Sequence, residues 1–164
     1  MKALDAVQLE VIRNALVAAA EEMGVTIWRT SRSSVVRDLL DYSTCMFDSE
    51  GLSVAQATCI PVHLNSMSSC LTDIIEKHIP LSDWHEGDII ITNDPYAGGQ
   101  HLNDVLTFKP TFVDGELVGI AGVLVHHPRC RRRCAGELLR GRDGDLSGGI
   151  PHSADEARRA RAAE

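Results

Sequence analysis

The chain has 164 residues, 44% of them hydrophobic, and carries a formal net charge of −7. This size and composition are typical of a folded globular chain, and the acidic balance argues against nucleic acid as a partner, since nucleic-acid binding needs a basic face. No apolar run is long enough to span a bilayer and no signal peptide is recognisable, so a cytoplasmic protein is expected.

The N-terminal segment predicts one long helix over about residues 5–29. Asp5 suits the N-cap position, and Gly24 is a weak point inside the helix. Apolar residues recur at spacings of three and four, the period of one buried helix face. They are Leu9, Ile12, Leu16, Ala19, Met23 and Ile27.

Beyond this helix, apolar runs bounded by turn residues predict strands. The expected strands are 44–48, 52–57, 87–92, 105–113 and 117–125. The first two form a hairpin, and the last two form another around the turn Asp114-Gly115. A second helix is expected over 64–78, closed by Pro80. This order of helix, hairpin, helix, strand, loop and hairpin predicts an α+β fold.

Residues 93–105, with the sequence N-D-P-Y-A-G-G-Q-H-L-N-D-V, hold the strongest candidates for chemistry. His101 and Asp104 follow a glycine pair and are three positions apart, which lets an imidazole and a carboxylate converge on one cation. His126 or His127, at the end of the last strand, would supply a distant third ligand. Neighbouring strand residues face opposite sides, so only one of the two points into a given site. The alternative is an Asp-capped turn with an exposed histidine.

Other polar residues carry weaker signals. Asp41 is either a turn carboxylate or a fourth ligand, and the residues alone leave both open. Asn93 and Asp94 are the candidate catalytic residues, as a polar floor beside the site, although a plain turn also explains them. The sequence contains no P-loop motif, so no ATP site of that kind is expected in it. The histidines expected at the surface or in local hydrogen bonds are His63, His78 and His85.

The motifs of residues 4–127 are specific enough to compare with known families. They include R-D-L-L-D-Y-S, F-D-S-E-G, I-P-V-H-L-N-S-M and G-D-I-I-I-T-N-D-P-Y-A-G-G-Q-H-L-N-D. These segments resemble the N-terminal part of hydantoinase B/oxoprolinase proteins. That family includes B subunits of ATP-dependent hydantoinases, the C-terminal region of 5-oxoprolinase and the related large subunits of acetone and acetophenone carboxylases. The resemblance implies that residues 1–127 are part of a larger hydantoinase B-type fold.

The resemblance also implies a division of labour in a hetero-oligomer. A hydantoinase A-type subunit binds ATP and phosphorylates the substrate carbonyl oxygen. The B-type component then completes the hydrolysis of a cyclic amide, or acts on a ketone-derived intermediate in the carboxylases. The family's divalent metal, which is zinc, manganese or iron, would be held here by Asp41, His101, Asp104 and His126.

Residues 128–164 differ in character from those before them. They hold nine of the 16 basic residues, all of them arginine, and no aromatic residue. Family members continue at this point with a glycine-rich run, and a shifted reading frame of this segment admits H-D-V-G-G-G-A-P-G-S, which looks like that run.

We therefore expect a frameshift after about His127 and a truncated, inactive chain. Residues 128–164 would form a largely disordered tail, apart from a weak helix near 155–163. The strands around Leu106 and Val123 would then lack partners. The non-catalytic alternative is a fragment that binds a partner through the helix 5–29.

Overall fold

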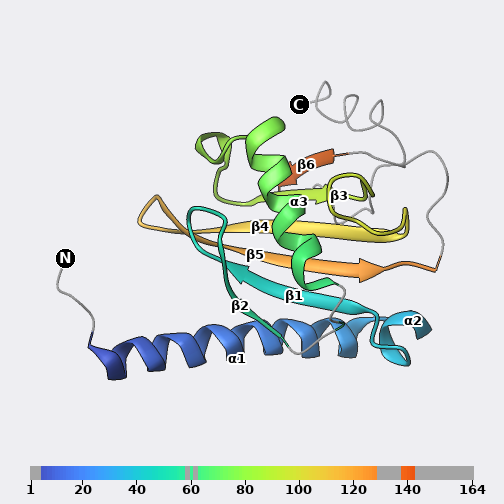
Figure 1. Ribbon diagram of the computed structural model, residues 1–164, viewed down its shortest axis with the longest axis horizontal. Coiled ribbons are helices and arrows are strands. Elements are labelled where there is room, and N and C mark those ends of the chain that lie inside the picture. Colours follow the sequence, from blue (N-terminus) through green and yellow to red (C-terminus); the bar gives the residue numbers. More distant parts are fainter. Residues whose placement is uncertain (1–4, 58–59, 61–62, 129–137, 143–164) are drawn as a thin grey trace.

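The computed structural model describes residues 5–57, 60, 63–128 and 138–142 of the chain. Within them lies a six-stranded sheet with the order β2-β1-β5-β4-β3-β6, in which all neighbours are antiparallel (Figure 1). The strands are β1 (Tyr42–Phe47), β2 (Ser53–Gln56), β3 (Asp88–Thr92), β4 (Asp104–Val113), β5 (Glu116–His126) and β6 (Leu138–Arg142). The helices are α1 (Ala6–Thr30), α2 (Ser34–Arg37), α3 (Leu64–Lys77) and the 3-10 turn η2 (Leu81–Asp83). The α+β expectation is confirmed, and no helix among the described residues has the length and apolarity needed to cross a membrane.

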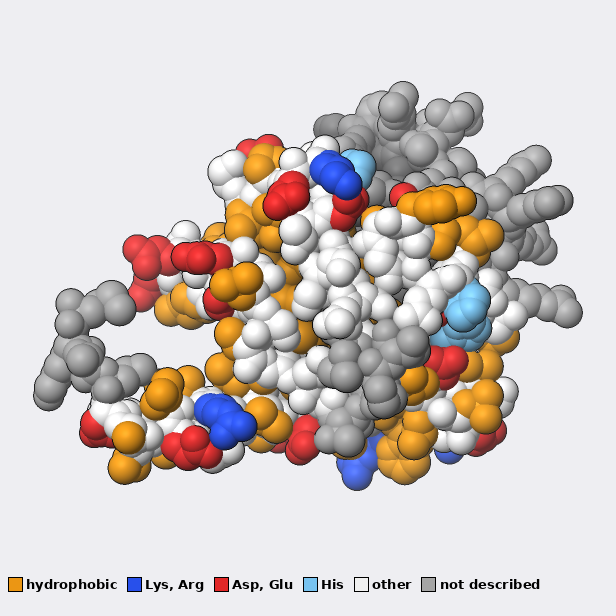
Figure 2. Space-filling model, viewed as in Figure 1, with side chains coloured by type: hydrophobic (Ala, Val, Ile, Leu, Met, Phe, Trp, Pro, Cys, Tyr) orange, Lys and Arg blue, Asp and Glu red, His pale blue; other side chains and the backbone are white. Residues whose placement is uncertain are grey.

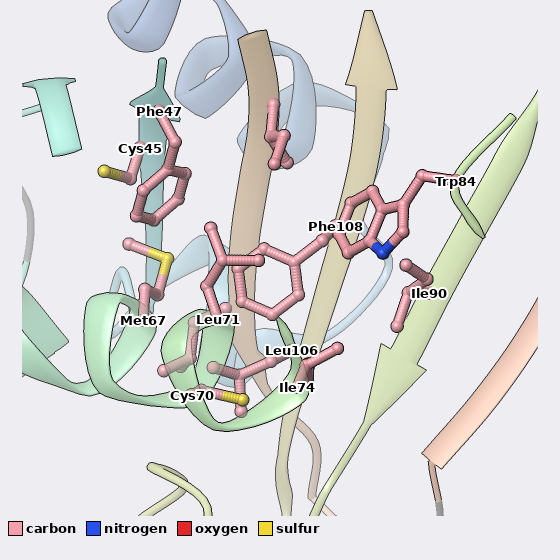
Figure 3. Close-up of a cluster of buried hydrophobic side chains, with 12 residues drawn as sticks. Cys45, Phe47, Met67, Cys70, Leu71, Ile74, Trp84, Ile90, Leu106 and Phe108 are labelled. Atoms are coloured by element: carbon pink, nitrogen blue, oxygen red, sulfur yellow. The ribbon is translucent and has the colours of Figure 1, made fainter. Parts of the chain in front are cut away.

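The main core lies between the sheet and α3 (Figure 3). Phe47 of β1 and Phe108 of β4 pack edge to face, with 6.0 Å between ring centroids. They point toward Leu71 of α3, and Trp84 closes one end of the cluster beside Ile90 (Figure 3). The helix expected over 64–78 is therefore confirmed, and its buried residues are those that contact the sheet: Met67, Cys70, Leu71 and Ile74.

Helix α1 packs on the opposite face, against β1 and β2. Alternate residues of β1 face opposite sides, so Thr44 turns away from α3 and its hydroxyl donates to the carbonyl of Ala20 in α1 at 2.7 Å. Asp5 is the N-cap of α1, as expected. It forms a capping box with Gln8, and the helix runs unbroken through Gly24.

The expected buried stripe of α1 is wrong in its N-terminal half. Leu9 is 60% exposed and Ile12 is 43% exposed, whereas Ala20 and Gly24 are the buried residues. The N-terminal half of α1 extends past β1 and β2 and leaves apolar side chains at the surface (Figures 1 and 2). Helical periodicity predicted the helix, but the length of the sheet beside it decides which turns are covered.

Both expected hairpins are present, and β4–β5 forms the centre of the sheet. Asp114 and Gly115 turn the chain with φ of 52° and 82°, the left-handed conformation expected for a tight D-G turn. Strand β4 also pairs with β3, and β5 also pairs with β1. The prediction that the strands around Leu106 and Val123 lack partners is therefore wrong.

Two further features depart from the expectations. Strand β6 pairs with β3 along its five residues, so the prediction of no stable packing after about residue 128 is wrong for Leu138–Arg142. The rest of 129–164, including the helix expected near 155–163, lies outside the described residues. The short helix α2 was not expected, because its four residues carry no periodic signal.

Candidate metal centre

One end of the sheet collects the beginnings of β1 and β4 and the end of β5. This follows from the antiparallel order β1-β5-β4, because alternate strands start where their neighbours finish. The register places Asp104 opposite His126 and Tyr42 opposite Val125. Asp41, just before β1, accepts the backbone N–H of His126 on its carbonyl oxygen at 3.1 Å. Three segments that are far apart in the sequence therefore meet at one place.

His101, Asp104 and His126 form a cluster at this end. One potential ligand atom from each residue lies within 4.8 Å of the other two. His126 Nδ1 is 2.7 Å from Asp104 Oδ1, and His101 Nδ1 is 3.4 Å from Asp104 Oδ2. His126, not His127, is the member of the pair that joins the cluster. Figure 2 shows histidine side chains at the surface on this side of the molecule, next to acidic ones.

Asp104 is the buried member of the cluster, with an exposure of 1%. Its Oδ2 accepts the backbone N–H groups of Gln100 at 2.9 Å and His101 at 2.8 Å. Burial alone would raise the pKa of Asp104, but the hydrogen bonds from His126 and from these two N–H groups outweigh it and leave the pKa below its ordinary value. The buried carboxylate is thus kept ionised beside two imidazoles.

The two interpretations of His101 and Asp104, a metal site and an Asp-capped turn with an exposed histidine, each describe part of this geometry. Asp104 does cap the turn before it, and the His101 side chain is 69% exposed. The same carboxylate also holds His126, which a local turn does not require. Two imidazoles and a carboxylate are ligands that zinc, manganese and iron accept, so the cluster fits a divalent metal.

Asp41 lies beside the cluster and contacts a histidine that was not predicted there. Its Oδ1 is 3.7 Å from Nε2 of His63, whose Nδ1 is 3.0 Å from the Ser43 hydroxyl. His63 is 4% exposed and its hydrogen-bond partner Ser43 is 20 residues away, so the expectation of a surface position or a local hydrogen bond is wrong for this residue. Burial lowers the pKa of His63, and the carboxylates of Asp41 and Asp104 oppose this effect in part. By contrast, His78 and His85 are exposed, as expected.

Asn93 and Asp94 form the beginning of the loop that carries His101. The buried Asn93 donates from Nδ2 to the carbonyl oxygen of Leu102 at 3.2 Å. Asp94 accepts the backbone N–H of Tyr96 on Oδ1 at 2.9 Å. Neither residue belongs to the three-residue cluster. Their hydrogen bonds fix the loop that presents His101.

His127 lies next to the cluster and ties two of its segments together. Its backbone N–H donates to the carbonyl oxygen of Asn103 at 2.9 Å. Burial lowers the pKa of the imidazole, and the neighbouring His126 lowers it further. The backbone bond joins the end of β5 to the residue just before β4, so it helps to hold Asp104 opposite His126.

Comparison with known proteins identifies the family, and the family model covers the segments that build the cluster. The family model for hydantoinase B/oxoprolinase matches residues 5–136. 5-oxoprolinase 1 of Arabidopsis thaliana is 39% identical over 127 residues, which cover 75% of this chain and 10% of that protein. Caprolactamase subunit beta of Pseudomonas jessenii is 39% identical over 121 residues, which cover 72% of this chain and 20% of that protein.

Solved structures share the fold. The ATP-dependent caprolactamase from Pseudomonas jessenii aligns with a TM-score of 0.72 and 26% identity, over 99% of this chain and 32% of that one. A nucleotide-free acetone carboxylase aligns with a TM-score of 0.63 and 25% identity, over 71% of this chain and 16% of that one. The chain therefore spans less than a third of the length of each of these proteins.

Proposed function

Since the chain belongs to the hydantoinase B/oxoprolinase family, we propose that it is part of the B-type component of an ATP-dependent enzyme that hydrolyses cyclic amides. Relatives named 5-oxoprolinase and caprolactamase support a cyclic amide as the substrate class. The substrate reaches this component as an intermediate that a partner has already phosphorylated.

The convergence of His101, Asp104 and His126 at one end of the sheet is the observation that carries this proposal. With Asp41 beside them, these residues would hold zinc, manganese or iron. A divalent metal bound there supplies a bound water of lowered pKa or polarises the intermediate.

The chain's own residues prepare the site in three ways. Asp104 holds His126 through its side chain and is itself held by two backbone N–H groups. Asn93 and Asp94 form the polar floor beside the site, and their hydrogen bonds set the course of the loop. The buried carboxylate provides negative charge where a cation is to be bound.

A hydantoinase A-type subunit is the proposed partner and the component that uses ATP. The sequence of this chain has no P-loop motif, and one relative is named as a subunit beta, which supports a hetero-oligomer. The net charge of −7 argues against nucleic acid as a partner, and a cytoplasmic location stays a prediction.

Metal content and ATP-dependent turnover together test the proposal. A full-length version of this protein, mixed with its A-type partner, a cyclic amide and ATP, is expected to contain a divalent metal and to open the ring. His78→Ala, at an exposed histidine, serves as the matched control for His126→Ala and is expected to keep both metal and turnover. A protein without metal and without turnover would contradict the proposal.

The proposed inactivity of the present chain and the proposed frameshift are tested separately. The 164-residue chain, mixed with the same partner, is expected to show no turnover. Resequencing the DNA around codon 127 checks the frameshift, which fails if no alternative frame opens into the family's glycine-rich run.

Two other functions have specific observations in their favour. The structural similarity to an acetone carboxylase supports a role in ketone carboxylation, which bicarbonate- and ketone-dependent ATP use would reveal. The exposed apolar residues of α1 support a non-catalytic fragment that binds a partner. That function predicts capture of an A-type subunit by this chain without turnover, and loss of capture on Leu9→Glu.

A further inference from the structure

His63 occupies a position whose burial the fold alone does not explain. It stands at the N-cap of α3, yet its side chain makes no capping hydrogen bond to the helix. Instead the ring turns inward and is 4% exposed. Burying an imidazole costs free energy unless its nitrogen atoms find partners, so the identity of those partners indicates what the residue does.

Each ring nitrogen of His63 faces a residue from the beginning of β1. Nδ1 is 3.0 Å from the hydroxyl of Ser43, which is fully buried. Nε2 is 3.7 Å from Oδ1 of Asp41. If the Ser43 hydroxyl donates to Nδ1, the neutral ring carries its proton on Nε2 and directs it at the Asp41 carboxylate. The separation of 3.7 Å is too long for a hydrogen bond and too short to hold a water between the two atoms, and a small rotation of the Asp41 side chain would bring the carboxylate into direct hydrogen-bond range.

The main chain of Asp41 is already fixed beside the cluster. Its N–H donates to the carbonyl oxygen of Val35 at 3.1 Å, and its own carbonyl accepts from His126 at 3.1 Å. The preceding Leu40 has φ of 55°, a strained conformation for leucine that persists only where the surroundings determine it. The carboxylate is not fixed in the same way, because within the described part of the chain His63 is its only hydrogen-bond or ion-pair partner.

We propose that His63, fixed by Ser43, is a positioning residue that directs the Asp41 carboxylate into the metal cluster formed by His101, Asp104 and His126. This inference rests on the proposed function of the cluster as a metal site. Residues that hydrogen-bond to metal ligands fix their orientation, and removing one typically weakens metal binding about 10- to 100-fold.

Zinc and cobalt titrations of the 164-residue chain, with zinc measured by competition against a chromophoric chelator, test the proposal. His63→Ala is expected to weaken zinc binding by about 10- to 100-fold, and Asp41→Ala by at least as much. Because His63 acts through Asp41, the double variant is expected to bind no more weakly than Asp41→Ala alone. His63→Gln keeps a side-chain N–H donor and is expected to recover part of the lost affinity.

His85→Ala is the matched control, because His85 also lies 3.8 Å from a carboxylate, that of Asp88, but outside the cluster. It is expected to leave zinc binding unchanged. Cooperative urea unfolding of each metal-free variant separates a local change from a failure to fold, and His63→Gln keeps the test decisive if His63→Ala does not fold.

Two results would overturn the positioning role while leaving the metal site intact. One is zinc binding by His63→Ala that equals that of the unaltered chain. The other is a further loss of affinity when His63→Ala is added to Asp41→Ala, with a change in the cobalt absorption spectrum, since that would make His63 a ligand itself. Failure of the unaltered chain to bind either metal would overturn the metal site and the inference together.

Discussion

The two ends of the β4–β5 hairpin differ in where their structure comes from. At the closed end, Asp114 and Gly115 make the turn by themselves, in solvent, with positive φ values of 52° and 82°. At the open end, Asp104 and His126 face each other among groups from β1, the loop 93–103 and the start of α3. The structure of the closed end depends on neighbouring residues alone, whereas the open end is formed by segments that are distant in the sequence.

The two ends are nevertheless coupled through the register of the hairpin. A turn of fixed length sets which residues pair, and that pairing places Asp104 opposite His126. A slip of one residue would turn every side chain of one strand to the other face of the sheet. Substitutions at the two ends therefore distinguish two contributions. Those at the turn test whether it sets the register, and those at the open end test the metal site that depends on this register.

The largest difference is expected for Asp104→Ala. Removing this carboxylate breaks its bond to His126 and takes away the acceptor that the N–H groups of Gln100 and His101 share. We expect a loss of about 3 kcal/mol in the free energy of unfolding and no measurable zinc binding. Urea denaturation and zinc titration measure the two effects. Asp104→Asn keeps one side-chain acceptor and should unfold at a urea concentration between those of the unaltered chain and Asp104→Ala. If Asp104→Ala binds zinc as tightly as the unaltered chain, Asp104 is not a metal ligand.

Gly98→Ala is expected to have the next largest effect. Gly98 has φ of 126°, and a Cβ there would lie 2.5 Å from the carbonyl oxygen of Ser66 and 2.8 Å from Cβ of Cys70, both in α3. The backbone of α3 cannot move away from the added methyl group without disrupting the helix. We therefore expect the free energy of unfolding to fall by about 3 kcal/mol, and zinc to bind more weakly because the loop that carries His101 is displaced. Thermal unfolding and zinc titration provide the measurements. Unchanged zinc affinity would mean that α3 does not position the loop.

Gly115→Ala makes the same change at the closed end and should cost less. Gly115 also has a positive φ, 82°, but nothing lies within 4 Å of the position of a Cβ. Only the backbone conformation is then penalised, by about 1 kcal/mol, and zinc affinity should stay the same. Comparing its melting temperature with that of Gly98→Ala measures the additional steric cost of the contact with α3. A loss of zinc affinity would show that the turn shifts the register when strained.

The smallest effect is expected for Asp114→Asn. Asparagine adopts the left-handed conformation readily and forms tight turns with a following glycine, so the free energy of unfolding should change by no more than about 0.5 kcal/mol. Zinc binding should be unaffected, because Asp114 lies at the far end of the hairpin from the cluster. Chemical denaturation with a parallel zinc titration checks both points. A large destabilisation would mean that the Asp114 charge has a structural partner that the turn itself does not need.

Much of the fold could be predicted from local patterns. The N-cap at Asp5, the D-G turn and the apolar runs of the strands depend on residues close in sequence, and the structure confirms all three. Residue spacing also brought out His101 and Asp104, because three positions separate them. Their proximity to His126 follows from the antiparallel hairpin, in which the end of β5 lies beside the start of β4.

The burial of α1 and the place of His63 could not be predicted in the same way. Periodicity indicates which face of a helix is apolar. Whether Leu9 and Ile12 on that face are buried depends on where the neighbouring strands end. His63 gave only the signal of a histidine ahead of a helix. Its partners Ser43 and Asp41 lie at least 20 residues away, and only the packing of α3 on β1 brings them to it.

The sequence by itself determined most of the elements, the turn that sets the β4–β5 register, and the pairing of His101 with Asp104 as candidate ligands. Those features depend on backbone conformation and side-chain spacing over a few residues. Only the tertiary structure decided that β1 lies beside β5, that Asp41 stands next to His126, and that a buried histidine faces Asp41. These long-range contacts follow from burying the apolar residues of α3 against the sheet, and that packing is a property of the whole chain.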